Sequence, residues 1–160
     1  MVERYNLEKW IWSDEDFEKM GWHDCKIHAV AFDEFNYKLL LDIDYIFKWA
    51  GPEEDGYYRF WISPATLIFE NVYDLDLDLG CRLGMIIENL ERINPSKPKN
   101  SDYIRKDIEW KWIFQTANGQ ISFKSVGYNQ YIRKAPIYKK NQEIQYEERG
   151  GYSFNTEVDK

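Results

Sequence analysis

Apolar and polar side chains alternate along several stretches of this chain, which is the pattern of a β-strand with one buried face. The segment 37–49 places aromatic or aliphatic residues at every odd position. Four of its even positions are charged: Lys38, Asp42, Asp44 and Lys48. The segment 73–79 repeats the pattern, with Asp74, Asp76 and Asp78 between Tyr73 and three leucines. Both segments are predicted to be half-buried strands.

Turn signals divide the remaining extended segments. The turn-like sequence DEFNY separates a strand over 25–32 from the strand over 37–49, which predicts an antiparallel hairpin. Asn118-Gly119 supplies two positions of positive φ for a tight turn, which pairs Thr116 with Ile121. This second hairpin has an aromatic face and a polar face. Pro64 lacks a backbone N–H and is expected at an edge, a bulge or a bend.

Two segments carry helical signals. Ser13 can cap the first turn of a helix, acids at 14–16 favour its positive end and Gly21 closes it, so a short N-terminal helix is predicted. Residues 83–93 have apolar residues at helical spacing, but the paired isoleucines, Gly84 and Pro95 also fit a strand. We expect a strand there, and a helix is the alternative.

These patterns predict one mainly β domain over 1–160, either an antiparallel sandwich or an open barrel, with the short N-terminal helix. An α+β fold with a further helix at about 83–93 is the alternative. An aromatic content of 18% suits the half-buried surface of a sheet. We expect residues 95–107 to form a mobile connector and residues 155–160 to fray.

Charge and hydropathy limit the partners. The chain has no apolar run of the length that a signal peptide or a membrane span requires, so we expect a cytoplasmic protein without membrane contact. A formal net charge of −7 argues against nucleic-acid binding and favours a basic protein as the partner. The sequence leaves open whether a homodimer covers the exposed strand edges.

The sequence GWHDCKIHAVAF, residues 21–32, gathers both histidines and one of the two cysteines. In a strand, His23 and Cys25 point to one side and His28 to the other, so this stretch alone does not complete a zinc site. We therefore expect neither a metal nor another cofactor. Cys25 faces the predicted core, where a thiol is inert, and both cysteines are interpreted as buried or semi-buried thiols.

The His23-Asp24 pair is the candidate polar site. A polar pair between a helix or loop and a strand commonly holds backbone groups of the turn, and a functional role is the alternative. No catalytic residue is assigned.

Two rows of aspartates form candidate acidic docking faces: Asp42, Asp44, Asp74, Asp76 and Asp78. Same-face neighbours on one strand lie about 6.5–7 Å apart, so either row could in principle bind a cation or act in acid/base chemistry. Alternating aspartates also keep one face of a strand solvated and can attract a basic partner. We expect solvated faces available for docking.

The order of these motifs resembles a group of small bacterial proteins of unknown function. Those proteins open with a His-Asp pair before the first strand and are similar to the immunity-type proteins found near polymorphic toxins. The resemblance covers most of residues 21–151 through WHDCKIHAVAF, LLLDIDYIFKW, FWISPATLIFENVYDLDLDL, IENLERI, WKWIFQTANGQISFKSVGYNQYIRKAP and QEIQYEERGG. It implies a mostly β fold and a protein-neutralising role.

Three functions follow from these observations. The first is a non-enzymatic protein-interaction module, with neutralisation of a basic toxin through an acidic surface as its specific form. The second is a hydrolase or metal-dependent enzyme that uses His23, Asp24 and strand carboxylates. The third is a small-ligand binder with a pocket walled by tryptophans. We favour the first.

Overall fold

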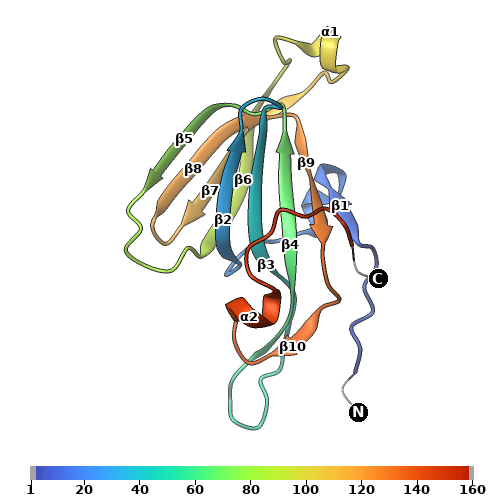
Figure 1. The fold of residues 1–160 in the computed structure, drawn as a ribbon, viewed down its shortest axis with the longest axis vertical. Coiled ribbons are helices and arrows are strands. Elements are labelled where there is room, and N and C mark those ends of the chain that lie inside the picture. Colours follow the sequence, from blue (N-terminus) through green and yellow to red (C-terminus); the bar gives the residue numbers. More distant parts are fainter. Residues whose placement is uncertain (1–2, 159–160) are drawn as a thin grey trace.

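Two antiparallel sheets face each other in the computed structural model, which describes residues 3–158 (Figure 1). The six-stranded sheet has the order β1-β9-β4-β3-β2, and β10 pairs with β4 beside this path. Its strands are β1 (Ile11–Ser13), β2 (Lys26–Asp33), β3 (Lys38–Ala50), β4 (Arg59–Glu70), β9 (Gly127–Ile132) and β10 (Ile137–Lys139). The four-stranded sheet, in the order β5-β8-β7-β6, contains β5 (Tyr73–Leu79), β6 (Ile87–Ser96), β7 (Glu109–Thr116) and β8 (Gly119–Ser125).

The prediction of a mainly β fold is confirmed, and of its two predicted forms, a sandwich or an open barrel, the structure has the sandwich-like arrangement of two sheets. Residues 87–96 form β6, so the described structure has a strand where the α+β alternative required a helix. The predicted connector 95–107 contains the end of β6 and the short helix α1 (Ser101–Ile104), and its mobility stays a prediction. Of the predicted frayed end, residues 159–160 lie outside the described residues, whereas Asn155 accepts a hydrogen bond from Thr66 through its backbone oxygen.

The predicted N-terminal helix is a 3-10 helix, η1 (Asp14–Lys19). Ser13 caps it, and Asp16 accepts a hydrogen bond from the backbone N–H of Ser13 to complete a capping box. The helix ends before Gly21 because Met20 is already extended. A further short helix, α2 (Tyr146–Arg149), follows β10.

Aromatic contacts join the two sheets. The ring of Phe69 on β4 lies 4.7 Å from that of Phe123 on β8 and 5.1 Å from that of Trp112 on β7. It also packs against Phe114 and Tyr128, and all five side chains are buried. The inner faces of both sheets therefore meet in an aromatic core, as the alternation on β3, β7 and β8 predicts.

Pro64 lies inside the continuous strand β4, and not at an edge or bend. On one side it pairs with Asp44 of β3. Its carbonyl faces the other side and accepts from the N–H of Arg133, in the gap between β9 and β10. Because the N and C=O of a residue in an antiparallel strand point to the same side, the missing N–H falls where β4 changes partner.

The register of the β7-β8 hairpin differs from the prediction. Phe114 pairs with Ile121 and Trp112 with Phe123, so Ala117-Asn118 forms the loop and Gly119 belongs to β8. The shift equals two residues, and each side chain keeps its predicted face. Gly119 has φ +133, and a Cβ there would lie 2.1 Å from the carbonyl oxygen of Asp78 on β5. The close approach of β5 thus requires this glycine.

In the described part of the chain, no helix is long and apolar enough to cross a membrane.

Substitution of Gly119 by alanine should destabilise the fold by about 2–3 kcal/mol, because the new Cβ overlaps the Asp78 carbonyl and the backbone has positive φ. Urea denaturation measures the change. The matched control is Gly21→Ala, where an added Cβ meets no atom within 4 Å and should change stability by less than about 1 kcal/mol. Equal losses in the two variants would contradict the packing assigned to β5.

Candidate functional site

The His23-Asp24 pair lies at the corner where the two sheets are joined. Asp24 has φ +67, a left-handed conformation that turns the chain into β2. Its backbone N–H donates to the oxygen of Ile87 on β6, and the N–H of Ile87 donates to the oxygen of Cys25. These bonds link the start of β2 in one sheet to the start of β6 in the other.

The side chains of this pair reach in two directions. The Nδ1 atom of His23 lies 2.9 Å from the backbone oxygen of Glu88, and the ring stacks on Trp49 with a centroid distance of 6.5 Å. Asp24 accepts from the amide nitrogen of Gln142 at 3.0 Å. The two side chains thus contact β6 and the segment after β10, and not the backbone of their own turn. Because the His23 side chain is 69% exposed, the functional alternative stays a prediction.

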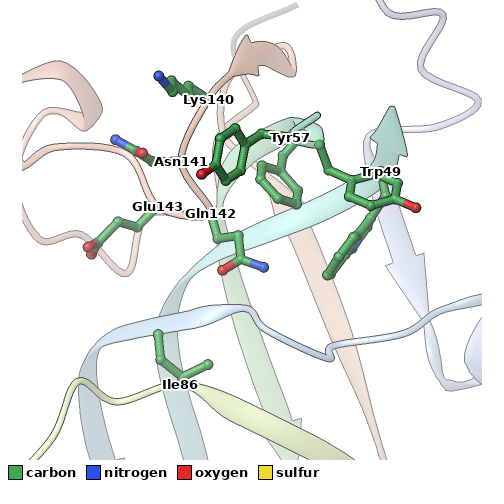
Figure 2. Close-up of a pocket in the computed structure, with 9 residues that line it drawn as sticks. Trp49, Tyr57, Ile86, Lys140, Asn141, Gln142 and Glu143 are labelled. Atoms are coloured by element: carbon green, nitrogen blue, oxygen red, sulfur yellow. The ribbon is translucent and has the colours of Figure 1, made fainter. Parts of the chain in front are cut away.

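An open groove lies beside this corner (Figure 2). Its volume is about 550 Å³. Its apolar wall comes from the end of β3, the start of β4, the preceding loop and the residue before β6: Trp49, Tyr57, Tyr58, Phe60 and Ile86. Residues 140–143, which follow β10, form its polar wall. In Figure 2 the side chain of Gln142 extends between Tyr57 and Ile86.

Three aromatic side chains in the groove are accessible. Trp49 is 43% exposed, Tyr58 48% and Tyr57 67%. Trp49 meets Phe60 edge to face at 5.1 Å and Tyr58 at 5.9 Å, in addition to its stack on His23. These contacts hold the indole in place although it is partly exposed. The groove therefore presents preformed, apolar ring faces, and we call it the aromatic groove.

The two predicted docking residues on β3 are not on the surface. Asp42 and Asp44 are both 0% exposed, so the prediction that they form a solvated docking face is wrong. The C-terminal part of the chain crosses the outer face of the six-stranded sheet over β3 and β4 (Figure 1). It brings Arg149, itself 3% exposed, against both carboxylates.

Asp42 receives four charged or polar hydrogen bonds. Arg149 donates to both of its oxygens at 2.7 Å, Arg133 donates at 2.7 Å, and the backbone N–H of Ser153 donates at 2.9 Å. Burial alone would raise the pKa of Asp42, but these donors outweigh it and hold the pKa below its ordinary value. Asp42 is therefore a structural anion.

Asp44 completes this cluster. Its oxygens accept from Arg149 Nε at 3.1 Å and from the backbone N–H of Ile144 at 2.8 Å. The Nε2 atom of His28 lies 2.6 Å from Asp44 Oδ2. His28, expected to be solvated on the polar face, is instead a partner of Asp44, and its side chain is 10% exposed. The two histidines point to different surroundings, as predicted, but His23 lies in the turn before β2, so strand alternation is not the cause.

The aspartates on β5 are exposed, as predicted: Asp74, Asp76 and Asp78. Asp74 lies 3.7 Å from Lys124 Nζ on β8. Asp76 and Asp78 stand opposite the uncharged Ser122 and Gln120. No cation therefore faces either of these two across the β5-β8 ladder, and we call the three aspartates the β5 acidic row.

The two cysteines differ in environment. Cys25 is fully buried, and burial raises the pKa of its thiol to about 12. Cys81 is exposed, so its interpretation as a buried or semi-buried thiol is wrong. The loop 80–86 leaves it on the surface because Gly80 and Arg82 bond to Asn118 at the hairpin tip, outside both sheets.

Among residues 3–158, no group of three or more histidine, cysteine, aspartate or glutamate side chains is arranged to hold a metal ion. Comparisons of the chain with protein-family models, curated proteins and solved structures found no match.

Sequence reasoning missed two sets of residues. The aromatic groove combines Trp49 with Tyr57 and Tyr58 from the two sides of an acidic loop, and the aromatic residues flanking that loop were the local signal. The buried cluster depends on Arg133 and Arg149, which are 91 and 107 positions from Asp42. No local pattern indicates that pairing.

Substitution of Asp42 by asparagine should cost about 3–5 kcal/mol at neutral pH, because Arg149 and Arg133 lose their shared counter-charge in a buried site. Because the native pKa of Asp42 is lowered, its contribution is complete above the unfolded pKa of about 3.9 and is lost as the pH falls through the native value. Urea denaturation at neutral pH and at about pH 3 should show the wild type losing more stability than Asp42→Asn.

The control for this experiment is Asp76→Asn, which removes an exposed carboxylate and should change stability by less than about 0.5 kcal/mol. If Asp42→Asn costs no more than this control, Asp42 does not have the structural role given to it.

The folded protein should react quickly with a thiol reagent such as DTNB at Cys81 alone. Cys25 should react only after unfolding in urea, because it is buried and its pKa of about 12 leaves almost no thiolate at neutral pH. In the variant Cys81→Ser, Cys25 is the one remaining cysteine, so any labelling reports on it. Rapid labelling of this variant in its folded state would contradict the burial of Cys25.

Proposed function

We propose that this protein is a non-enzymatic interaction module that docks a basic partner protein on the β5 acidic row. The observation that carries the proposal is the exposure of Asp74, Asp76 and Asp78 together on the edge strand β5. Asp76 and Asp78 have no cationic cross-strand neighbour, so their charge is available to a partner.

Electrostatics supports a basic partner. The formal net charge of −7 favours approach of a cationic protein from a distance, and a row of carboxylates on one strand gives the encounter an orientation. The resemblance to immunity-type proteins supports the more specific proposal that this partner is a basic toxin. Binding over the row would neutralise the toxin by covering part of its cationic surface.

The geometry supports the enzyme alternative less well. The enzyme alternative requires carboxylates from β3. Asp42 and Asp44 are instead bound by Arg149 in the buried cluster. His23 and Asp24 hold backbone and C-terminal groups at the corner between the sheets. No observation brings these two sets of side chains together around one reacting atom.

The test uses the protein encoded immediately upstream of the gene for this chain, produced as an inactive variant. We expect binding by the wild type that weakens when sodium chloride is raised from about 50 to 500 mM. The variant D74N/D76N/D78N should bind roughly tenfold or more weakly at low salt, mainly through slower association. Biolayer interferometry measures both rates.

The matched control is E34Q/E54Q/D102N, which removes the same number of negative charges from exposed positions outside β5. It should bind almost as the wild type does. Equal weakening in the two triple variants would mean that only net charge matters, and the proposed docking face would be wrong. Absence of binding by the wild type would refute the toxin-neutralising role.

A further inference from the structure

The aromatic groove carries no residue of the β5 acidic row and has different chemistry. Its polar wall contains one cation, Lys140, and one anion, Glu143. The carboxylate of Glu143 also lies 4.0 Å from Lys26 Nζ. Lys140 would therefore repel a cationic ligand, and Glu143 would repel an anionic one. This balance of charge favours a neutral ligand.

The groove offers two kinds of contact to such a ligand. Trp49, Tyr57 and Tyr58 expose ring faces or edges, which bind apolar surface. Asn141 and Gln142 contribute amides, which both donate and accept hydrogen bonds. Figure 2 shows Gln142 between the aromatic wall and Ile86, so amide and rings can contact one bound molecule.

The amide of Gln142 is held in position. Its nitrogen donates to Asp24 at 3.0 Å, and Asp24 itself is fixed by the backbone bond to Ile87. Trp49 is fixed by its contacts with His23, Phe60 and Tyr58. A rigid ring and a rigid amide lose little conformational entropy on binding. The site is therefore preorganised for a ligand that needs both groups.

Sugar rings have this combination of surfaces. A pyranose ring has faces of C–H groups, which stack on aromatic rings, and a rim of hydroxyl groups, which both donate and accept hydrogen bonds. A neutral sugar also matches the balanced charge. We propose that the aromatic groove binds a short neutral oligosaccharide, with one sugar ring on Trp49 and hydroxyl groups bonded by Gln142 and Asn141.

The volume is consistent with this ligand. At about 550 Å³, the groove falls within the range of roughly 300–1,000 Å³ of small-molecule sites. Tyr57 is 67% exposed, so one end of the groove is open to solvent. The site is independent of the β5 acidic row, so either proposal can fail without the other.

The test uses ¹⁹F NMR of the full chain labelled with 5-fluorotryptophan, with Trp49→Phe to assign the resonance of the groove. The probes are cellotriose, maltotriose and tri-N-acetylchitotriose, each added up to about 10 mM. At least one should shift the Trp49 resonance in a saturable way and leave the other tryptophans unchanged. This shift should not depend on salt, because the ligand is uncharged.

Two variants locate the contact. Tyr57→Ala and Gln142→Ala should each weaken binding of that sugar by about tenfold. The matched control is Tyr103→Ala, which removes a 91% exposed tyrosine on α1, outside the groove, and should bind normally. The unchanged resonances of the remaining tryptophans show that each variant is folded.

Two results would overturn the proposal. One is the failure of all three sugars to move the Trp49 resonance. The other is a shift produced instead by a decaproline peptide, since proline-rich segments also dock on grooves lined by tryptophan and tyrosine. The second result would make the groove a peptide-binding site.

Discussion

The buried pairing of Asp42 with Arg149 is the interaction on which the arrangement of the molecule depends. Both side chains are almost completely removed from water, and an ion transferred alone into the interior would cost several kcal/mol. The two arginines and the two aspartates of the cluster cancel in charge, and their hydrogen bonds satisfy the carboxylate oxygens. Only with these partners in place can β3 be buried on both faces.

This pairing also positions the groove. The backbone N–H of Ile144 donates to Asp44, and Ile144 directly follows the groove residues 140–143. Ser153, further along, donates to Asp42 through its backbone. The carboxylates of β3 thus fix two points of the C-terminal segment on the sheet. Gln142 lies two residues before the first of these points, which explains how a segment after β10 provides a defined wall.

Alternation predicted the shared faces within the regular parts of the strands, such as residues 39–45 of β3. The register shifts between Ile46 and Lys48 and between Tyr73 and Asp76 place Trp49 and Tyr73 on the face opposite to the predicted one. Alternation also could not predict which faces are exposed to water. Asp42 and Asp78 have the same local pattern of aspartate between leucine or isoleucine, yet one is buried and the other exposed. The difference comes from Arg149, 107 positions away from Asp42. The hairpin register has a similar cause, because the approach of β5 determines where Gly119 is needed. Both features depend on contacts between residues that are far apart in the sequence.

The same limit applies to the candidate sites. The β5 acidic row could be predicted because its exposure needs no partner from elsewhere in the chain. The aromatic groove could be predicted only in part, because its two walls come from β3, β4 and the segment after β10. The role of His23-Asp24 as a link between sheets depends on β6, more than 60 residues further on.

The shape of β5 indicates how a partner would recognise it. β5 is the edge of its sheet, where a free backbone could pair with a strand of another protein. However, the pairing with β8 is interrupted between Tyr73 and Asp76, and Asp74 has φ +53. An irregular edge that carries charge opposes the addition of a strand. Recognition at β5 therefore depends on its carboxylate side chains, whereas the aromatic groove depends on preformed rings, and the two surfaces would respond differently to salt.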